Sequence, residues 1–126
     1  MWGRVRNVAS GEPVLGSARR CVSFFCRLRG LTFRRALGAD EGLWLVGSNE
    51  SRLETAIHML FVFFPIAAVW LDARGRVVDK ALARPFQLMI LPQAPARDVL
   101  EGPPALLEEI AVGDRLVFES EDSSDA

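Results

Sequence analysis

The sequence lacks most of the features that metal sites, redox sites and membrane spans require. It contains one histidine, His58, and two cysteines, Cys21 and Cys26, too few for the usual zinc or redox ligand sets. We therefore expect no metal and no cofactor, and two reduced, largely buried thiols. The longest uncharged apolar stretch, residues 59–71, contains a proline and is shorter than the roughly 20 residues of a membrane-spanning helix.

Familiar catalytic motifs are absent as well. The chain has no GxSxG, HExxH, Walker A or CxxC element, so the common nucleophilic, zinc, nucleotide and redox mechanisms have no anchor. No apolar segment follows Arg4 and Arg6 near the start, and a secretory signal would need one. These absences predict a soluble protein of the cytoplasm.

Charge is nearly balanced overall but uneven along the chain. The formal net charge is −1, and Lys80 is the only lysine, which gives no global reason to expect nucleic acid or a membrane as a partner. Arginine is concentrated before residue 36, whereas residues 119–126 carry four acids. We expect a single domain over residues 1–118 and an acidic, disordered tail over residues 119–126.

Local patterns predict a mainly β fold with two helices. Alternation and turn signals predict strands over residues 2–8, 43–46, 54–64, 66–71, 76–78, 86–91, 97–100 and 115–118. The firmest of these predictions is a β-hairpin around the turn Asp72–Gly75. Apolar residues at helical spacing from Ala18 onward predict an amphipathic helix with a basic outer face, and Pro103-Pro104 favour a short helix over residues 105–110. Together they indicate an antiparallel sandwich or distorted barrel.

The order of several short motifs resembles the DUF192 family of bacteria and archaea. The motifs are Arg27-Leu28-Arg29-Gly30-Leu31, Asp40-Glu41-Gly42, Ile57-His58-Met59, Phe64-Pro65-Ile66, Val69-Trp70-Leu71-Asp72, Ala96 to Gly102, and Val112-Gly113-Asp114-Arg115. The resemblance implies a mostly β, sandwich-like domain and brings no established activity, substrate or cofactor. One departure is Ala67, which stands where the family usually has an aspartate, so a function that depends on this aspartate would be missing here.

Five residues are candidates for a ligand site: Arg29, Trp44, His58, Glu101 and Asp114. The planar fork of Arg29 suits a carboxylate or phosphate, although stabilising the end of the helix or pairing with Glu41 or Glu101 is the favoured role for it. Trp44 stands two residues after Gly42 at the edge of a short strand, where an indole can line a surface groove, although the three tryptophans are expected mainly to build the core. His58 lies in an apolar segment, where a buried histidine is more often structural than catalytic. Glu101 and Asp114 adjoin glycines, where carboxylates commonly accept turn hydrogen bonds.

Three functions remain open from the sequence. The leading hypothesis is a non-enzymatic module that binds a small molecule or a peptide in a cleft near His58, Arg29 and Glu101. The second is a hydrolase-like enzyme that uses His58 as general base, oriented by Glu101 or Asp114. The third is nucleic-acid or phosphate binding by the predicted helix face with Arg19, Arg20 and Arg27, which we expect to weaken steeply with salt.

Overall fold

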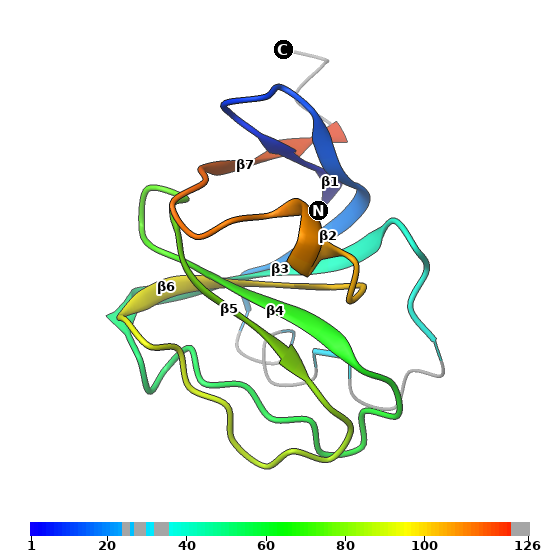
Figure 1. The fold of residues 1–126 in the computed structure, drawn as a ribbon, viewed down its shortest axis with the longest axis vertical. Helices are drawn as coiled ribbons and strands as arrows, with labels where there is room; N and C mark the ends of the chain where they lie inside the picture. The colour runs from blue at the N-terminus through cyan, green and yellow to red at the C-terminus, as the bar shows by residue number, and fades with distance from the viewer. Residues whose placement is uncertain (24–25, 27–29, 32–35, 122–126) are drawn as a thin grey trace.

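A computed structural model shows one open sheet of seven strands and little helix (Figure 1). It describes residues 1–23, 26, 30–31 and 36–121. The strands are β1 (Trp2–Asn7), β2 (Pro13–Cys21), β3 (Glu41–Ser51), β4 (Ile66–Leu71), β5 (Val77–Ala83), β6 (Ala96–Gly102) and β7 (Leu116–Ser120), and the short helix α2 is Leu106–Glu109. The predicted mainly β class is thereby confirmed.

The strands follow the order β5-β4-β6-β3-β2-β1-β7 across the sheet. All neighbouring pairs are antiparallel except β2 and β3, which are parallel. The expected antiparallel sandwich or barrel is therefore corrected to one open, mixed sheet. Figure 1 places β1, β2 and β7 at one end of the molecule and the long loops after β3 and β5 at the other.

Each face of the sheet carries its own hydrophobic cluster. The first cluster, here called the loop-side core, lies under the loops after β3 and β5 and includes Leu45, Ile57, Met59, Trp70 and Val99. The second cluster, here called the helix-side core, includes Val5, Trp44, Val69, Leu100 and Leu106. Successive residues of a strand point to opposite faces, so β4 and β6 supply apolar side chains to both cores.

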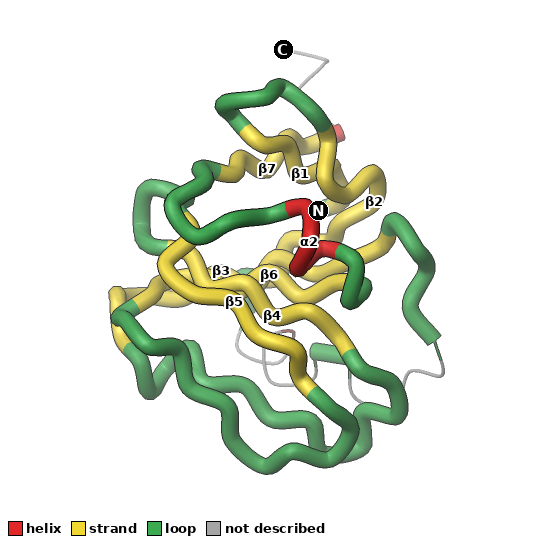
Figure 2. Tube along the Cα trace, in the orientation of Figure 1, coloured by secondary structure: helices red, strands yellow, loops and turns green. Residues whose placement is uncertain are grey.

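The helix-side core is closed by α2, which lies over the central strands (Figure 2). Leu106 and Ile110 are buried beneath it. Lys80 of β5 donates from Nζ to the carbonyl oxygens of Leu107 at 2.5 Å and Ile110 at 2.7 Å. A cation at the carbonyl end of a helix complements the helix dipole, so the only lysine fixes α2 to the sheet. The short late helix predicted over residues 105–110 is present in this shorter form.

The predicted amphipathic helix from Ala18 is wrong over residues 18–21. Residues 18–21 form the end of β2 and pair in parallel with residues 42–45 of β3. Leu15, Ala18 and Cys21 are buried at every third position, a spacing that suits a helix. A register irregularity in the pairing of β1 with β2 lets Leu15 and Ala18 both face the helix-side core, whereas Cys21 faces the loop-side core on the other side of the sheet. Residues 24–25 and 27–29 of the predicted helix lie outside the described residues.

The predicted strands over residues 54–64 and 86–91 are also wrong. Strand β4 already pairs with β5 on one side and β6 on the other, so no position beside β4 is left for residues 54–64. The two segments instead form loops that meet in an isolated bridge between Ile57 and Ile90. Met59 also donates its N–H to the carbonyl of Gln87 at 2.7 Å and accepts from the N–H of Phe86 at 2.9 Å.

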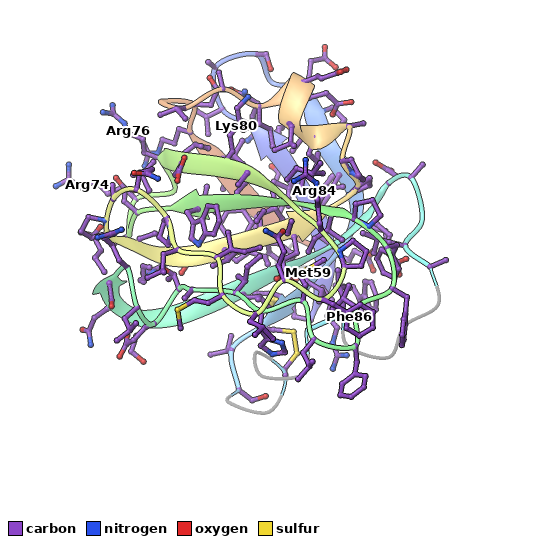
Figure 3. The ribbon with its side chains drawn as sticks, turned by 60° about the horizontal axis from the view of Figure 1, so that its bottom comes forward. Met59, Arg74, Arg76, Lys80, Arg84 and Phe86 are labelled. Atoms are coloured by element: carbon purple, nitrogen blue, oxygen red, sulfur yellow. A yellow bond between two sulfur atoms is a disulfide. The ribbon has the colours of Figure 1, made fainter. Side chains whose placement is uncertain are left out.

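The outer side of these loops exposes aromatic side chains. Phe86 packs edge-on against Phe61 and Phe63, with ring centroids 6.3 and 5.6 Å apart. Phe61 and Phe86 have φ of 58° and 65°, a left-handed backbone that bulky residues rarely adopt. Figure 3 shows Met59 beneath the strands and Phe86 farther out on the adjoining loop.

The other strand predictions near the chain ends and in the hairpin are confirmed. Strands β1, β4, β6 and β7 cover most of the predicted ranges. In the β4–β5 turn, Asp72 Oδ1 accepts from the N–H groups of Arg74 and Arg76 at 2.9 Å each, and Gly75 has φ of 84°. Strand β7 extends to Ser120, two residues into the predicted tail. Residues 122–126 of that tail lie outside the described part.

Candidate ligand-binding pocket

A cavity of about 430 Å³ lies between the sheet and the loop after β3. This volume falls within the usual range for small-molecule sites. Most of the side chains that line it are apolar and a few are polar. The apolar ones include Leu31, Ile57, Met59, Val62, Ile66 and Val99. The polar ones are Ser48, Glu54, Thr55, His58, Arg97 and Glu101. The pocket is thus an apolar space with polar groups at defined positions.

Strand β6 brings Glu101 to this pocket. In the register of the sheet, Glu101 lies between Leu43 of β3 and Ala68 of β4. Val99, two residues earlier, is on the same face and also lines the cavity. Because β6 lies inside the sheet with both faces covered, its residues from 98 to 102 are all buried, and Glu101 has only 6% of its surface exposed.

The Glu101 carboxyl has no hydrogen-bond partner in the described part of the chain. Loss of water around the buried group disfavours the ionised form, and this burial raises the pKa of Glu101 to about 7. At neutral pH the carboxyl therefore exists in both protonation states. An unpaired buried carboxyl is costly for a fold, and such groups are concentrated at functional sites.

The neighbouring cation, Arg97, is already engaged. Its Nε donates to Asp98 Oδ1 at 2.9 Å and its Nη2 to Asp98 Oδ2 at 3.1 Å. The hydrogen bond to Asp98 raises the pKa of Arg97. Arg97 therefore contributes to the wall of the pocket as one half of a bidentate ion pair.

His58 lies on the loop after β3 and lines the pocket, but its side chain is exposed. The expected buried position in a strand is therefore wrong. Burial alternates along this loop, with Ile57 and Met59 inside and His58 and Leu60 outside, which explains the strand-like pattern. No hydrogen bond among the described residues joins His58 to Glu101 or Asp114, so the base–carboxylate pair of the hydrolase hypothesis does not form in this structure.

Trp44 is buried in the helix-side core, with 5% of its surface exposed. Its Nε1 donates to Asp98 Oδ2 at 2.9 Å, and its ring meets Phe118 edge-on at 6.2 Å. It lines a second, more open depression of about 350 Å³ together with Arg74 and Asp98. Trp44 and Glu101 therefore belong to different sites.

The remaining candidates do not join the Glu101 pocket in the described part of the chain. Asp114 precedes β7, where its Oδ2 accepts from Asn7 Nδ2 at 3.1 Å and from the N–H of Ala111 at 2.9 Å. These are turn and strand-end contacts of the kind expected for an aspartate beside glycine. Arg29 lies outside the described residues, although Gly30 and Leu31, which follow it, line the pocket.

The two cysteines form a disulfide between Cys21, at the end of β2, and Cys26. The prediction of two reduced thiols is therefore wrong. That prediction assigned both residues to one helix, with their side chains on different faces. The strand ends at Cys21 instead, and its Cα lies 5.5 Å from that of Cys26, a separation that suits a disulfide.

Two features beside the pocket were not predicted from the sequence. Asp98 is 1% exposed and accepts from Trp44, Arg97 and the N–H of Gly47. Trp70 donates from Nε1 to the carbonyl of Thr55 at 2.7 Å and so fixes the pocket loop to β4. An acid inside an apolar strand is a sequence signal for the first feature, but the second depends on how the loop folds back.

Comparison with known proteins places the chain in a family. The DUF192 family model (Uncharacterized ACR) matches residues 7–118. The chain belongs to the DUF192 family. A UPF0127 protein from Pyrococcus furiosus is 31% identical over 112 residues, which covers 87% of this chain and 93% of the relative. A second UPF0127 protein, from Thermococcus gammatolerans, is 34% identical over 106 residues, which covers 84% and 67%.

Two crystal structures share the fold of this DUF192 chain. A candidate transcription regulator from Sinorhizobium meliloti superposes with a TM-score of 0.82 at 23% identity, covering 94% of each chain. A protein of unknown function from Novosphingobium aromaticivorans gives 0.73 at 21% identity, covering 93% of this chain and 84% of the other. At this level of identity the likeness establishes the fold.

Within the described residues of this DUF192 member, no helix has the length and apolar character to cross a membrane. Within the same residues, no group of three or more histidine, cysteine or acidic side chains is placed to hold a metal ion.

Proposed function

We propose that this protein binds a small, largely apolar molecule in the pocket that contains Glu101. The observation that carries the proposal is a buried carboxyl without a partner in the described chain, exposed to a cavity of about 430 Å³. Ligand sites commonly combine an apolar wall with a few polar groups that fix orientation. Glu101, with Ser48 and His58 along the wall, provides such groups.

Binding is favoured over hydrolysis by the hydrogen bonds near the pocket. A general base needs an orienting partner within hydrogen-bond reach, and neither His58 nor Glu101 has one among the described residues. The nucleic-acid hypothesis has less support, because Arg19 and Arg20 lie on β2 rather than on a helix face and Arg27 lies outside the described residues. We keep both as alternatives.

The location of the protein remains a prediction. The sequence favoured the cytoplasm, whereas a disulfide between Cys21 and Cys26 is typical of oxidising compartments. We therefore propose that the protein acts where thiols are oxidised. Detection of free thiols on both cysteines in protein alkylated inside intact cells would contradict this.

A blocked pocket tests the proposed function. Ser48 is exposed and lines the cavity, so Ser48→Trp should obstruct the space without disturbing the core. Asn49→Trp, on the next and equally exposed residue, does not line the cavity and is the matched control. A library of small apolar molecules is screened by ligand-observed NMR.

We expect some molecules to bind the wild type and Asn49→Trp and to lose binding at least about tenfold in Ser48→Trp, the equivalent of about 1.4 kcal/mol. A library without a single hit, or hits that bind all three proteins equally, would show that this pocket is not the binding site.

A further inference from the structure

Most of the ionisable side chains that line the pocket are acidic if Arg97, which is paired with Asp98, is left aside. The titratable side chains on its described wall are Glu54, His58, Arg97 and Glu101. Arg97 is committed to Asp98 by two hydrogen bonds. The two carboxyl groups and the imidazole are left to meet a ligand, and this set complements a cation better than an anion.

The elements packed around Glu101 supply no cation of their own in the described chain. Strand β3 places Leu43 beside it and strand β4 places Ala68 beside it. The pocket loop adds the apolar Ile57 and Met59, with Glu54 and the exposed His58 near the mouth. Gly30 and Leu31 complete the described wall. Among the residues that the structure describes, the Glu101 carboxyl therefore has neither an ion-pair partner nor a hydrogen bond.

The wall of the pocket also indicates which kind of cation fits. Its described lining contains no phenylalanine or tryptophan, and quaternary ammonium groups are usually held by the faces of such rings. A primary ammonium instead carries three N–H donors, which an ionised carboxyl can accept in strong, charge-assisted bonds. The remaining wall suits an aliphatic body, because Leu31, Val62, Ile66 and Val99 are buried side chains without polar atoms.

We propose that the ligand is a primary amine on an aliphatic body, bound in its protonated form with the ammonium against the Glu101 carboxylate. This inference rests on the proposed function and names the ligand class of the same pocket. It also predicts coupling to protons. The ammonium binds the ionised carboxyl, so a protonated Glu101 must release its proton first, and burial holds the pKa of Glu101 at about 7 in the free protein.

A matched ligand series tests the proposal by NMR titration. The probes are cyclohexylmethylamine, the neutral cyclohexylmethanol, cyclohexanecarboxylate, and the N,N,N-trimethyl derivative of the amine. At pH 8 we expect the primary amine to bind the wild type at least about tenfold more tightly than the alcohol, since one charge-assisted hydrogen bond accounts for a factor of this size. The carboxylate and the trimethyl derivative should bind more weakly than the primary amine.

Variants assign the effect to one carboxyl. Glu101→Gln keeps the shape of the side chain and should abolish the preference for amine over alcohol, while binding of the alcohol is retained. Glu54→Gln removes the other, exposed acid of the wall and is the matched control, with a loss of less than about threefold because exposed charges interact weakly. In the wild type, the affinity for the amine should decrease as the pH falls below 7, and the decrease should approach a factor of about ten for each pH unit.

The outcomes separate the ligand class from the pocket. If amine and alcohol bind equally and both are blocked by Ser48→Trp, the pocket binds ligands but the amine assignment is overturned. If Glu54→Gln rather than Glu101→Gln removes the amine preference, the assignment to Glu101 is overturned. If none of the four probes binds while other library members do, the ligand class is wrong. If nothing binds at all, the proposed function also fails.

Discussion

Asp98 and Glu101 are two buried acids of the same strand with opposite surroundings. Asp98 points towards the helix-side core and accepts hydrogen bonds from Trp44, Arg97 and the N–H of Gly47. Glu101 points towards the loop-side pocket and has no such partner in the described chain. Breaking a satisfied buried ion pair is costly, and an unsatisfied buried acid is itself destabilising, so the two faces of the sheet differ in how each accommodates its buried acid.

Removing Asp98 should have the largest effect on stability. Asp98→Ala leaves the buried indole N–H of Trp44 and the guanidinium of Arg97 without their acceptor, and we expect a loss of about 4 kcal/mol in the free energy of unfolding. Urea denaturation followed by tryptophan fluorescence measures this loss. A loss below about 1 kcal/mol would mean that Asp98 does not differ from Glu101 in the way described.

Replacing Glu101 should have the opposite sign and depend on pH. Because the folded-state pKa of about 7 exceeds the ordinary value of 4.5, the folded protein holds more protons than the unfolded one between these values, and stability falls as the pH rises from 4.5 to 7. Glu101→Gln cannot ionise, so it should be more stable than the wild type by at most about 3 kcal/mol at pH 8.

The same variant provides its own control at low pH. At about pH 4, Glu101 is largely protonated in both states, so Glu101→Gln and the wild type should unfold at similar urea concentrations. A constant difference between pH 4 and pH 8 would contradict the origin of the effect in ionisation of Glu101.

Reducing the disulfide between Cys21 and Cys26 removes a covalent link on the face of the sheet that carries Glu101, because Cys21 packs in the loop-side core. Reduction should lower the free energy of unfolding by about 2 kcal/mol, as estimated for so short a closed loop. Thermal unfolding with and without reductant measures the shift. The double variant Cys21→Ser/Cys26→Ser should not respond to reductant, and free thiols in the unreduced wild type would show that the bond is absent in solution.

Removing the indole donor of Trp70 should have the smallest effect of the four. Trp70→Phe removes the 2.7 Å bond to the carbonyl of Thr55, with an expected cost of about 1 kcal/mol. The loss concerns the pocket loop, so hydrogen exchange of the Ile57 and Met59 amides should accelerate more than that of amides in β6. Equal acceleration in both places would mean that Trp70 stabilises the sheet as a whole.

The sequence predicted those parts of the fold in which local signals agree with long-range pairing. The β4–β5 hairpin was found because Asp72 and Gly75 stand where a tight turn needs them. Residues 54–64 were misassigned because their alternating burial comes from a loop that covers the sheet, and the sheet positions next to β4 are already occupied. The sequence of residues 54–64 does not show that β5 and β6 occupy the positions beside β4.

The site was predicted in part for the same reason. Glu101 and His58 were both singled out and both line the pocket, although His58 is exposed rather than buried. Trp44 is buried, as favoured for the tryptophans, and also lines the second depression, but its partner there, Asp98, lies 54 positions away and accepts its N–H inside the protein. Such pairings depend on strand order, which the spacing of residues along the chain does not determine.

The pairing of β1 with β7 has a consequence for synthesis of the chain. Residue 3 lies opposite residue 120, so during translation the outer edge of β1 has no neighbour until residues 116–120 have left the ribosome. A bare strand edge is a template for pairing with other chains, and sheets closed by distant segments fold slowly. We therefore expect the outer edge of β1 to stay open to pairing with other chains until β7 has been made.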